Sequence, residues 1–359
     1  MRRIFAAGLA AAGMLLVAGC WSPGTASPAS PSGGVKAKAA AVPAGPPGVQ
    51  ASGALRLGIG GDLTDAPALI GLQMGFFGQN LSKVTLEPQT YTSEAQEVTA
   101  LGEGLLDAAY LDPVTALQAW QASPGQLKIV AGSAAGGAEL VVSSQVTSPT
   151  QLKGKQLAPP AGGTQLAAAD HWLQQQNLPA LTGNEADGAA SADSGILSEF
   201  TSGKIAGGWE LPPLNVEMTA AGGKVLVNEA SQWPGSQYPT AVLVVTQQFL
   251  TANPDAVTGL LEGQIQADNF LTSSPVSAQA ALAQRLTATG SPLSADVISQ
   301  SLAQLTFTDS PLPATLATEA DNAVTTGLLK PLTNLASAYD LTLLNQVRQA
   351  EGQQPISAK

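Results

Sequence analysis

The chain has very few of the side chains on which most metal sites and nucleophilic active sites depend. Among its 359 residues there is one cysteine, Cys20, and one histidine, His171. A single cysteine cannot form an internal disulfide, and one cysteine with one histidine cannot supply a transition-metal site. We therefore expect no metal, no cofactor and no catalytic residue, and a fold stabilised by its apolar core.

Charged residues are also scarce, and most of them are acidic. Charged residues make up 11% of the chain, with Asp and Glu outnumbering Lys and Arg by 26 to 15. A net charge of −11 repels polyanions, so nucleic acid is not an expected partner. Hydrophobic residues reach 44%, enough for a sizeable core. No stretch after the N-terminal region is long and apolar enough to cross a membrane.

The first 19 residues are typical of a secretory signal peptide. Arg2 and Arg3 precede a short apolar run, Ile4–Val17, and small residues follow it. The stretch LLVAGC, residues 15–20, resembles the lipobox of bacterial lipoproteins, in which the cysteine is acylated and becomes the mature N-terminus. That resemblance implies an extracytoplasmic protein anchored to the cell membrane by lipid at Cys20. The alternative is ordinary cleavage beside an incidental cysteine.

The segment 20–53 comprises Cys20 and a linker with almost no large apolar side chain. It is rich in Pro, Gly, Ser and Ala, a composition that cannot form a core and predicts disorder. The fold is therefore expected to begin near Ala54.

From Ala54 onward, short apolar runs alternate with helical patterns. Such repeated strand and helix units predict an α/β fold with largely parallel sheets covered on both faces. We expect strands at 55–60, 83–88, 105–111, 127–132, 138–144, 205–210, 224–228 and 241–246. We expect helices at 66–77, 94–104, 113–120, 164–176 and 195–204, and a mostly helical C-terminal part.

The order of several segments resembles the type II periplasmic-binding-protein fold. The segments are APALIGLQMGFFGQ, ALGEGLLDAAYLDPVTAL, LKIVAGSAAGGAELVVSS, QLKGKQLAPPAGG, EFTSGKIAGGWELPP and AYDLTLLNQV. Specifically, the order resembles the branch of that fold that serves ABC importers of sulfonates, nitrate, taurine and thiamine precursors. The resemblance implies two α/β lobes with a cleft between them. Lobe 1 would be 54–142 plus 240–359 and lobe 2 would be 143–239, with crossovers near Val142 and Thr240.

In open α/β sheets the ligand binds beyond the carboxyl ends of the strands, so the loops there hold the candidate residues. Acidic side chains could accept hydrogen bonds or pair with a cation, aromatic rings could stack on a flat ligand, and amides at a helix start could bind an acceptor group. The candidates are Asp62, Thr64, Asp65, Tyr110, Asp112, Gly163, Thr164, Trp209 and Glu210.

Each candidate also has a purely structural interpretation. Thr164 could simply cap a helix, and one of Asp62 and Asp65 could do the same before Pro67, as could Asp112 before Pro113. Trp209 could pack inside a lobe instead of facing a ligand. These alternatives remain open from the sequence.

The charge pattern bears on the class of ligand. Beyond the signal peptide the chain has three arginines, Arg56, Arg285 and Arg348, and none lies in a candidate loop. A sulfonate or nitrate would meet several carboxylates there without a guanidinium to offset them. We therefore expect a neutral or cationic ligand, such as a nitrogen heterocycle or an amine, with sulfonate or nitrate as the alternative.

The function implied by the resemblance is solute capture for import. The partners would be a small-molecule ligand, an ABC permease and its ATPase, and the membrane through the lipid anchor, with the protein itself a monomer. A tethered ligand sensor without transport is the alternative. Enzyme activity is not expected. The thiamine-precursor branch resembles a pyrimidine synthase, and that enzyme uses histidine and cysteine with iron. In this chain His171 is expected on a helix face and Cys20 belongs to the lipid anchor, so the two cannot form such a site.

Overall fold

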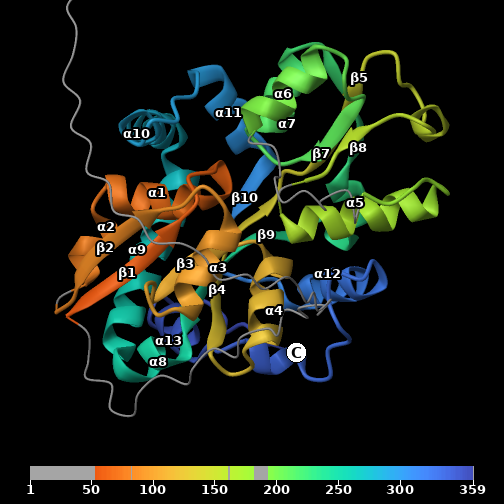
Figure 1. Cartoon of the computed structure of the whole chain (residues 1–359). Helices are drawn as coiled ribbons and strands as arrows, with labels where there is room; N and C mark the ends of the chain where they lie inside the picture. The colour runs from red at the N-terminus through yellow and green to blue at the C-terminus, as the bar shows by residue number, and fades with distance from the viewer. Residues whose placement is uncertain (1–52, 82, 161, 182–192, 359) are drawn as a thin grey trace, which may run out of the picture. The chain divides into compact units, whose positions relative to one another are not determined.

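The computed structural model describes residues 53–81, 83–160, 162–181 and 193–358. The predicted signal peptide, Cys20 and nearly all of the predicted linker lie outside the described residues. Two β-sheets organise the fold (Figure 1). The six-stranded sheet has the order β10 (Leu305–Phe307), β4 (Leu127–Gly136), β9 (Pro239–Thr246), β3 (Ala108–Leu111), β1 (Ala54–Ile59), β2 (Thr85–Thr90). The four-stranded sheet has the order β6 (Leu157–Ala158), β7 (Gly207–Glu210), β5 (Glu139–Ser143), β8 (Gly223–Asn228).

Helices precede or follow most strands, as the alternating pattern predicts. The α-helices are α1 (Ala66–Gln73), α2 (Phe76–Asn80), α3 (Glu94–Gly102), α4 (Pro113–Ala122), α5 (Gly163–Gln175), α6 (Asp193–Thr201), α7 (Leu214–Ala220), α8 (Gln247–Ala252), α9 (Pro254–Ser273), α10 (Pro275–Ala288), α11 (Ala295–Gln304), α12 (Pro313–Thr325) and α13 (Thr342–Ala350). The 3-10 helices are η1 (Leu63–Asp65), η2 (Pro149–Leu152), η3 (Glu229–Gln232), η4 (Pro234–Ser236) and η5 (Leu335–Ala338).

Both sheets are mixed, so the prediction of largely parallel pairing needs correction. Strands β1 to β4 run in one direction, but β9 lies between β3 and β4 and pairs antiparallel with both. In the smaller sheet β6 and β7 are parallel, whereas β5 runs against β7 and β8. The reason is that β9 enters the larger sheet after the chain returns from the smaller one. The carboxyl ends of β1, β3 and β4 nevertheless share one edge.

The chain leaves the larger sheet a few residues earlier than predicted. Strand β5 belongs to the four-stranded sheet, so Val142 lies within the second lobe and not at the crossover. The change of sheet takes place at Gly136 and Gly137, whose φ angles of 81° and 93° suit glycine alone. A Cβ on Gly137 would also lie 2.7 Å from a methyl carbon of Leu305. Thr240 lies near the start of β9, the strand that returns to the larger sheet.

Each lobe has its own buried apolar residues. The larger core joins β1, β3, β4 and β9 to α1, α9 and α10, and the smaller cores lie on the faces of the four-stranded sheet. The helix expected at 66–77 is broken into α1 and α2, because Gly75 adopts a left-handed conformation with φ 75°. This turn places the ring of Phe77 against Gly71, where a Cβ would approach it to 2.4 Å.

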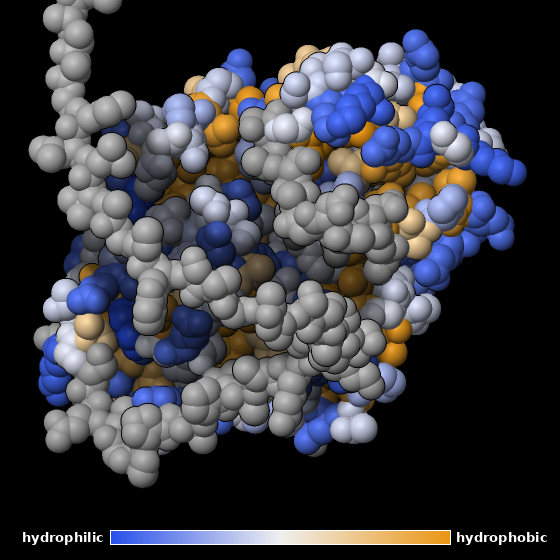
Figure 2. Space-filling view, in the orientation of Figure 1, coloured by the Kyte–Doolittle hydropathy of each residue, from blue (hydrophilic) through white to orange (hydrophobic). Residues whose placement is uncertain are grey.

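Hydrophilic side chains cover much of the outer surface of the second lobe in Figure 2, including the end of α5, where Gln174, Gln175 and Gln176 are exposed. Within the described ranges, no helix combines the length and the apolar character needed to cross a membrane.

Candidate ligand-binding site

Three of the predicted residues follow β1 at the shared carboxyl edge. Asp62 is exposed, whereas Thr64 and Asp65 are buried in η1. The Oδ2 atom of Asp65 accepts a hydrogen bond of 2.8 Å from the backbone N–H of Gly60. Burial, followed by the charge of Asp62, raises the pKa of Asp65 to about 7, although N–H donors from the glycine turn oppose the shift. Asp62 and Asp65 stand at the N-cap positions of η1 and α1, but neither side chain makes the capping hydrogen bond.

Two further carboxyl groups reach the same edge from α3, and the sequence analysis did not single them out. Glu94 accepts a 2.8 Å hydrogen bond from the backbone N–H of Asp112, and burial raises its pKa well above the ordinary value, with Asp112 adding to the shift. Glu97 is completely buried, and neither of its carboxylate oxygens accepts a hydrogen bond within the described residues. Burial, and then the charges of Asp65 and Asp62, raise the pKa of Glu97 to about 9.

We call Asp62, Asp65, Glu94, Glu97 and Asp112 together the acidic edge. The described residues contain three ion pairs, which join Arg56 to Asp107, Arg348 to Asp309, and Lys204 to Glu199. None of them involves Asp65, Glu97 or Asp112. The described residues also hold no group of three or more metal-binding side chains that could hold a metal ion. The acidic edge is therefore suited to hydrogen-bond donors and organic cations.

Asp112 joins the two lobes through its carboxylate. It caps its own helix α4 by accepting from Thr115 N and Oγ1, both at 2.8 Å. It also accepts from the start of α5 in the second lobe: Gly163 N at 2.7 Å, Thr164 N at 3.2 Å and Thr164 Oγ1 at 2.7 Å. In return, Thr164 Oγ1 accepts from Val114 N at 2.9 Å. The structure thus brings the predicted residues Asp112, Gly163 and Thr164 together.

This arrangement changes what the start of α5 can bind. The N-terminal amides of a helix attract anions, and here those of Gly163 and Thr164 already have the Asp112 carboxylate as their acceptor. An anionic ligand would have to displace a negative group of the same chain, close to other carboxyl groups. Thr164 is also more than an N-cap of α5. Its hydroxyl donates to Asp112 and accepts from Val114 N at the start of α4, and does not bond to the start of its own helix.

Replacing Asp112 by alanine is expected to loosen the contact between the lobes. The change leaves donors on Thr115, Gly163 and Thr164 without their acceptor, so the free energy of unfolding should fall by about 2–4 kcal/mol. Denaturant unfolding measures this loss, and hydrogen exchange at the Gly163 and Thr164 amides should accelerate. Exchange at these two amides as slow as in the unaltered protein would contradict the interlobe role.

Tyr110 and Trp209 lie in the lobe interiors. The Tyr110 hydroxyl donates to Gln264 Oε1 at 2.9 Å inside the larger core. Trp209 is 2% exposed, its indole N–H donates to Glu229 Oε2 at 2.6 Å, and its ring centroid is 5.8 Å from that of Trp172. Both rings are buried because the alternation of each strand turns them into the cores, and the stacking role stays a prediction.

Glu210 ends β7 and points away from Trp209, its neighbour on the strand. Its carboxylate lies over Gly208, where a Cβ would come within 2.3 Å of Oε1. Glu210 is buried and pairs across the sheet with Glu139, which the sequence analysis left out.

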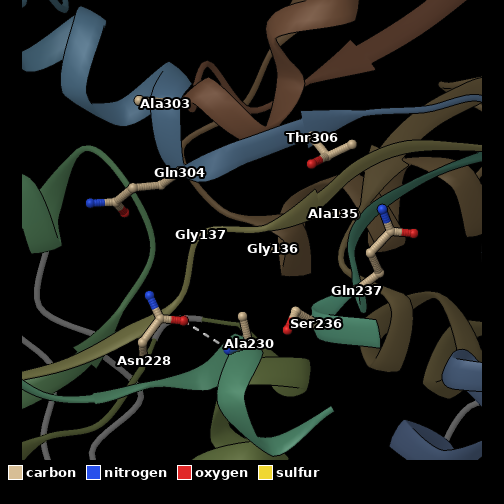
Figure 3. A pocket seen from close by; sticks show the side chains of 10 residues that line it. All are labelled: Ala135, Gly136, Gly137, Asn228, Ala230, Ser236, Gln237, Ala303, Gln304 and Thr306. Atoms are coloured by element: carbon tan, nitrogen blue, oxygen red, sulfur yellow. Dashed lines mark hydrogen bonds between the residues drawn. The ribbon is translucent and has the colours of Figure 1, made fainter. Parts of the chain in front are cut away.

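Beside the crossing segments the surface is hollowed by a cavity of about 250 Å³ (Figure 3). Its lining includes Gly136, Gly137, Asn228, Gln304 and Thr306, and it contains no charged side chain. None of the nine predicted ligand-binding residues lines it. The cavity therefore belongs to the region where the chain changes sheets and not to the acidic edge.

The sequence did carry a signal for Glu97. Its helix buries positions 97, 100 and 101, the spacing of one helix face, and two of these are Ala100 and Leu101. A carboxylate on the apolar face of a helix is costly to bury, so its presence there marks a position with a specific partner.

Comparison with known proteins places the chain in a family. The model of the NMT1-like family matches residues 50–287. The chain belongs to the NMT1-like family. A search of curated protein sequences finds no relative of this NMT1-like protein.

Solved structures share the fold of this NMT1-like protein at low sequence identity. A zinc-bound ligand-binding component of an ABC-type import system from Staphylococcus aureus has a TM-score of 0.66 at 15% identity, covering 81% of this chain and 97% of its own. The alkanesulfonate-binding protein SsuA from Xanthomonas axonopodis, bound to MOPS, has a TM-score of 0.61 at 18% identity, with 79% and 96% covered. The nitrate-binding protein NrtA from Synechocystis has 0.69 at 13%, with 86% and 92% covered. The fold is therefore the type II periplasmic-binding-protein fold, with two α/β lobes and a cleft between them.

Proposed function

We propose that this NMT1-like protein is the extracytoplasmic solute-binding component of an ABC importer, which captures a small molecule between its lobes and delivers it to a permease and its ATPase. The family and the shared fold support the import role, since the solved proteins of this fold include an import component and binding proteins for an alkanesulfonate and nitrate. The predicted signal peptide and LLVAGC support a protein tethered outside the membrane by lipid at Cys20, which we propose to act as a monomer.

The ligand that the site fits best is neutral or cationic, such as an amine or a nitrogen heterocycle. One observation carries this choice: Asp65, Glu94, Glu97 and Asp112 gather where the lobes meet, and the α5 amides that would suit an anion are hydrogen-bonded to Asp112. Sulfonate or nitrate in the same role is the second candidate, favoured by the binding proteins that share the fold. A tethered sensor would use the same site without a permease.

Thermal unfolding of the full chain tests the proposal against amines, nitrogen heterocycles, alkanesulfonates and nitrate. A ligand present at 100 times its dissociation constant should add about 2.7 kcal/mol to the stability of the native state. We expect an amine or a heterocycle to raise the unfolding midpoint and the anions to leave it unchanged. Stabilisation by a sulfonate alone would keep the solute-binding role and overturn the charge argument. A midpoint that none of the classes moves would count against solute binding.

A further inference from the structure

We propose that Glu97, together with Asp65, binds a positively charged nitrogen of the ligand, an ammonium or amidinium group, at the carboxyl end of β1. This inference rests on the proposed function and adds to it the chemical group that is recognised and the residues that recognise it.

The first argument is the cost of Glu97 where it stands. Its side chain is 0% exposed, and neither carboxylate oxygen has a hydrogen-bond partner among the described residues. An unpartnered buried carboxyl group costs several times the energy of an ordinary hydrogen bond. An apolar residue at the same place, beside Ala100 and Leu101 on the buried face of α3, would avoid that cost. A ligand that donates to Glu97 would offset it.

The second argument is the close approach of two carboxyl groups to glycines in β1 and in the turn that follows it. A Cβ on Gly58 would lie 3.1 Å from Glu97 Oε1 and 2.6 Å from a methyl carbon of Leu106. A Cβ on Gly60 would lie 3.2 Å from Asp65 Oδ2. The Glu97 carboxyl group therefore lies over Gly58, and the Asp65 carboxyl group lies over Gly60, two residues further along the chain.

The two carboxyl groups lie close enough together for the charge of Asp65 to raise the pKa of Glu97. A nitrogen cation can donate a hydrogen bond of about 2.8 Å to each of two carboxylates. One ammonium or amidinium group is therefore expected to donate to both Glu97 and Asp65.

The surrounding charges select a cation and not an anion. The charged groups that act on Glu97 are the carboxyl groups of Asp65 and Asp62 after β1, and Glu94 on the same helix is coupled to it in turn. Arg56, on the same strand β1, is held by Asp107 and Gly104. Calcium and magnesium require six or more oxygen ligands, and no cluster of three metal-binding side chains exists among the described residues. An organic nitrogen cation is the class that remains.

The protonation of Glu97 gives the binding step a measurable signature. With a pKa of about 9, Glu97 carries its proton at neutral pH before ligand binds. An ammonium ion favours the ionised carboxylate, so its binding releases a proton from this group. Calorimetry in two buffers of different ionisation enthalpy detects that proton.

The test uses the full chain with charged probes and uncharged counterparts of the same shape: putrescine against 1,4-butanediol, and benzamidine against benzamide. We expect at least one charged probe to raise the unfolding midpoint while its counterpart does not. Glu97→Gln should weaken binding of that probe at least tenfold and abolish the proton release. Glu103→Gln, an exposed change at the end of the same helix, should alter neither.

Two controls keep the result specific to Glu97. The ligand-free Glu97→Gln protein should unfold at a midpoint no lower than the unaltered chain, because it loses a buried ionisable group and keeps its shape. Asp65→Asn serves as a second variant with the same expected loss of probe binding.

Equal binding of a charged probe by the unaltered chain and Glu97→Gln would overturn this inference and leave the proposed function standing. Failure of every charged probe would overturn the inference, and stabilisation by sulfonates alone would overturn both the inference and the ligand class.

Discussion

Replacing Trp209 by alanine is expected to lower the free energy of unfolding by about 3–5 kcal/mol, the usual cost of truncating a large buried aromatic residue. Trp209 is 2% exposed and packs on Trp172 in the core of the second lobe. The change also removes the N–H donor of the 2.6 Å hydrogen bond to Glu229, which is fully buried. Trp233 donates to the other oxygen of that carboxylate at 3.1 Å, so Glu229 would keep one partner. Chemical denaturation followed by circular dichroism measures the loss.

Trp209→Phe separates the two contributions. Phenylalanine keeps most of the apolar packing but has no N–H, so we expect a smaller loss, about 1–3 kcal/mol. The exposed change Gln175→Ala on α5 is the matched control and should have little effect. A Trp209→Ala protein that keeps its stability and loses only its affinity for ligand would show that the indole faces the ligand after all.

The ligand-free protein is expected to lose stability steadily as the pH rises from about 5 to about 9. Several buried carboxyl groups have raised pKa values, among them Glu97 at about 9, and Asp65 and Glu229 at about 7. Burial is the largest cause in each case. In the unfolded chain these groups lose their protons near pH 4, whereas the folded protein keeps them until the higher values. Their stabilising effect is therefore complete below about pH 4 and declines as the pH rises through 7 and then 9.

The size of the effect follows from linkage. Each group that is protonated only in the folded state changes the free energy of unfolding by about 1.4 kcal/mol per pH unit, so the sum should exceed about 3 kcal/mol across this range. Denaturant unfolding at intervals of one pH unit measures the decline. Glu97→Gln should make the decline less steep between pH 5 and pH 9, and Glu229→Gln should make it less steep below pH 7. Constant or rising stability from pH 5 to pH 8 would mean that these carboxyl groups are not buried as described.

Much of the fold could be predicted from local pattern. The strand expected at 55–60 is β1 at Ala54–Ile59, and the helix expected at 164–176 is α5 at Gly163–Gln175. Apolar runs closed by glycine and proline set these elements, because periodicity and turn chemistry act within a few residues. The same local rules could not show that β9 would insert between β3 and β4, which depends on the path of the chain through the second lobe.

The candidate site was predictable only in part. The loops after β1 and β3 and the start of α5 were identified, because the carboxyl ends of strands in α/β sheets meet at one edge. The partner of each polar group was not. Asp112 could be identified as a capping residue from Pro113, but its contact with Gly163 joins residues 51 positions apart. No local pattern specifies a hydrogen bond of that range.

By itself the sequence determined the order of strands and helices, the scarcity of cysteine and histidine, and a surplus of carboxylates in the loops that follow the strands. Only the tertiary structure decided which side of each element faces a core: Trp209 and Tyr110 point into the lobes, whereas Glu97 points from α3 toward β1. The physical reason is that burial and electrostatic cost depend on neighbours brought together by the whole fold. Those neighbours decide whether a buried carboxyl group binds a partner or only lowers the stability of the fold.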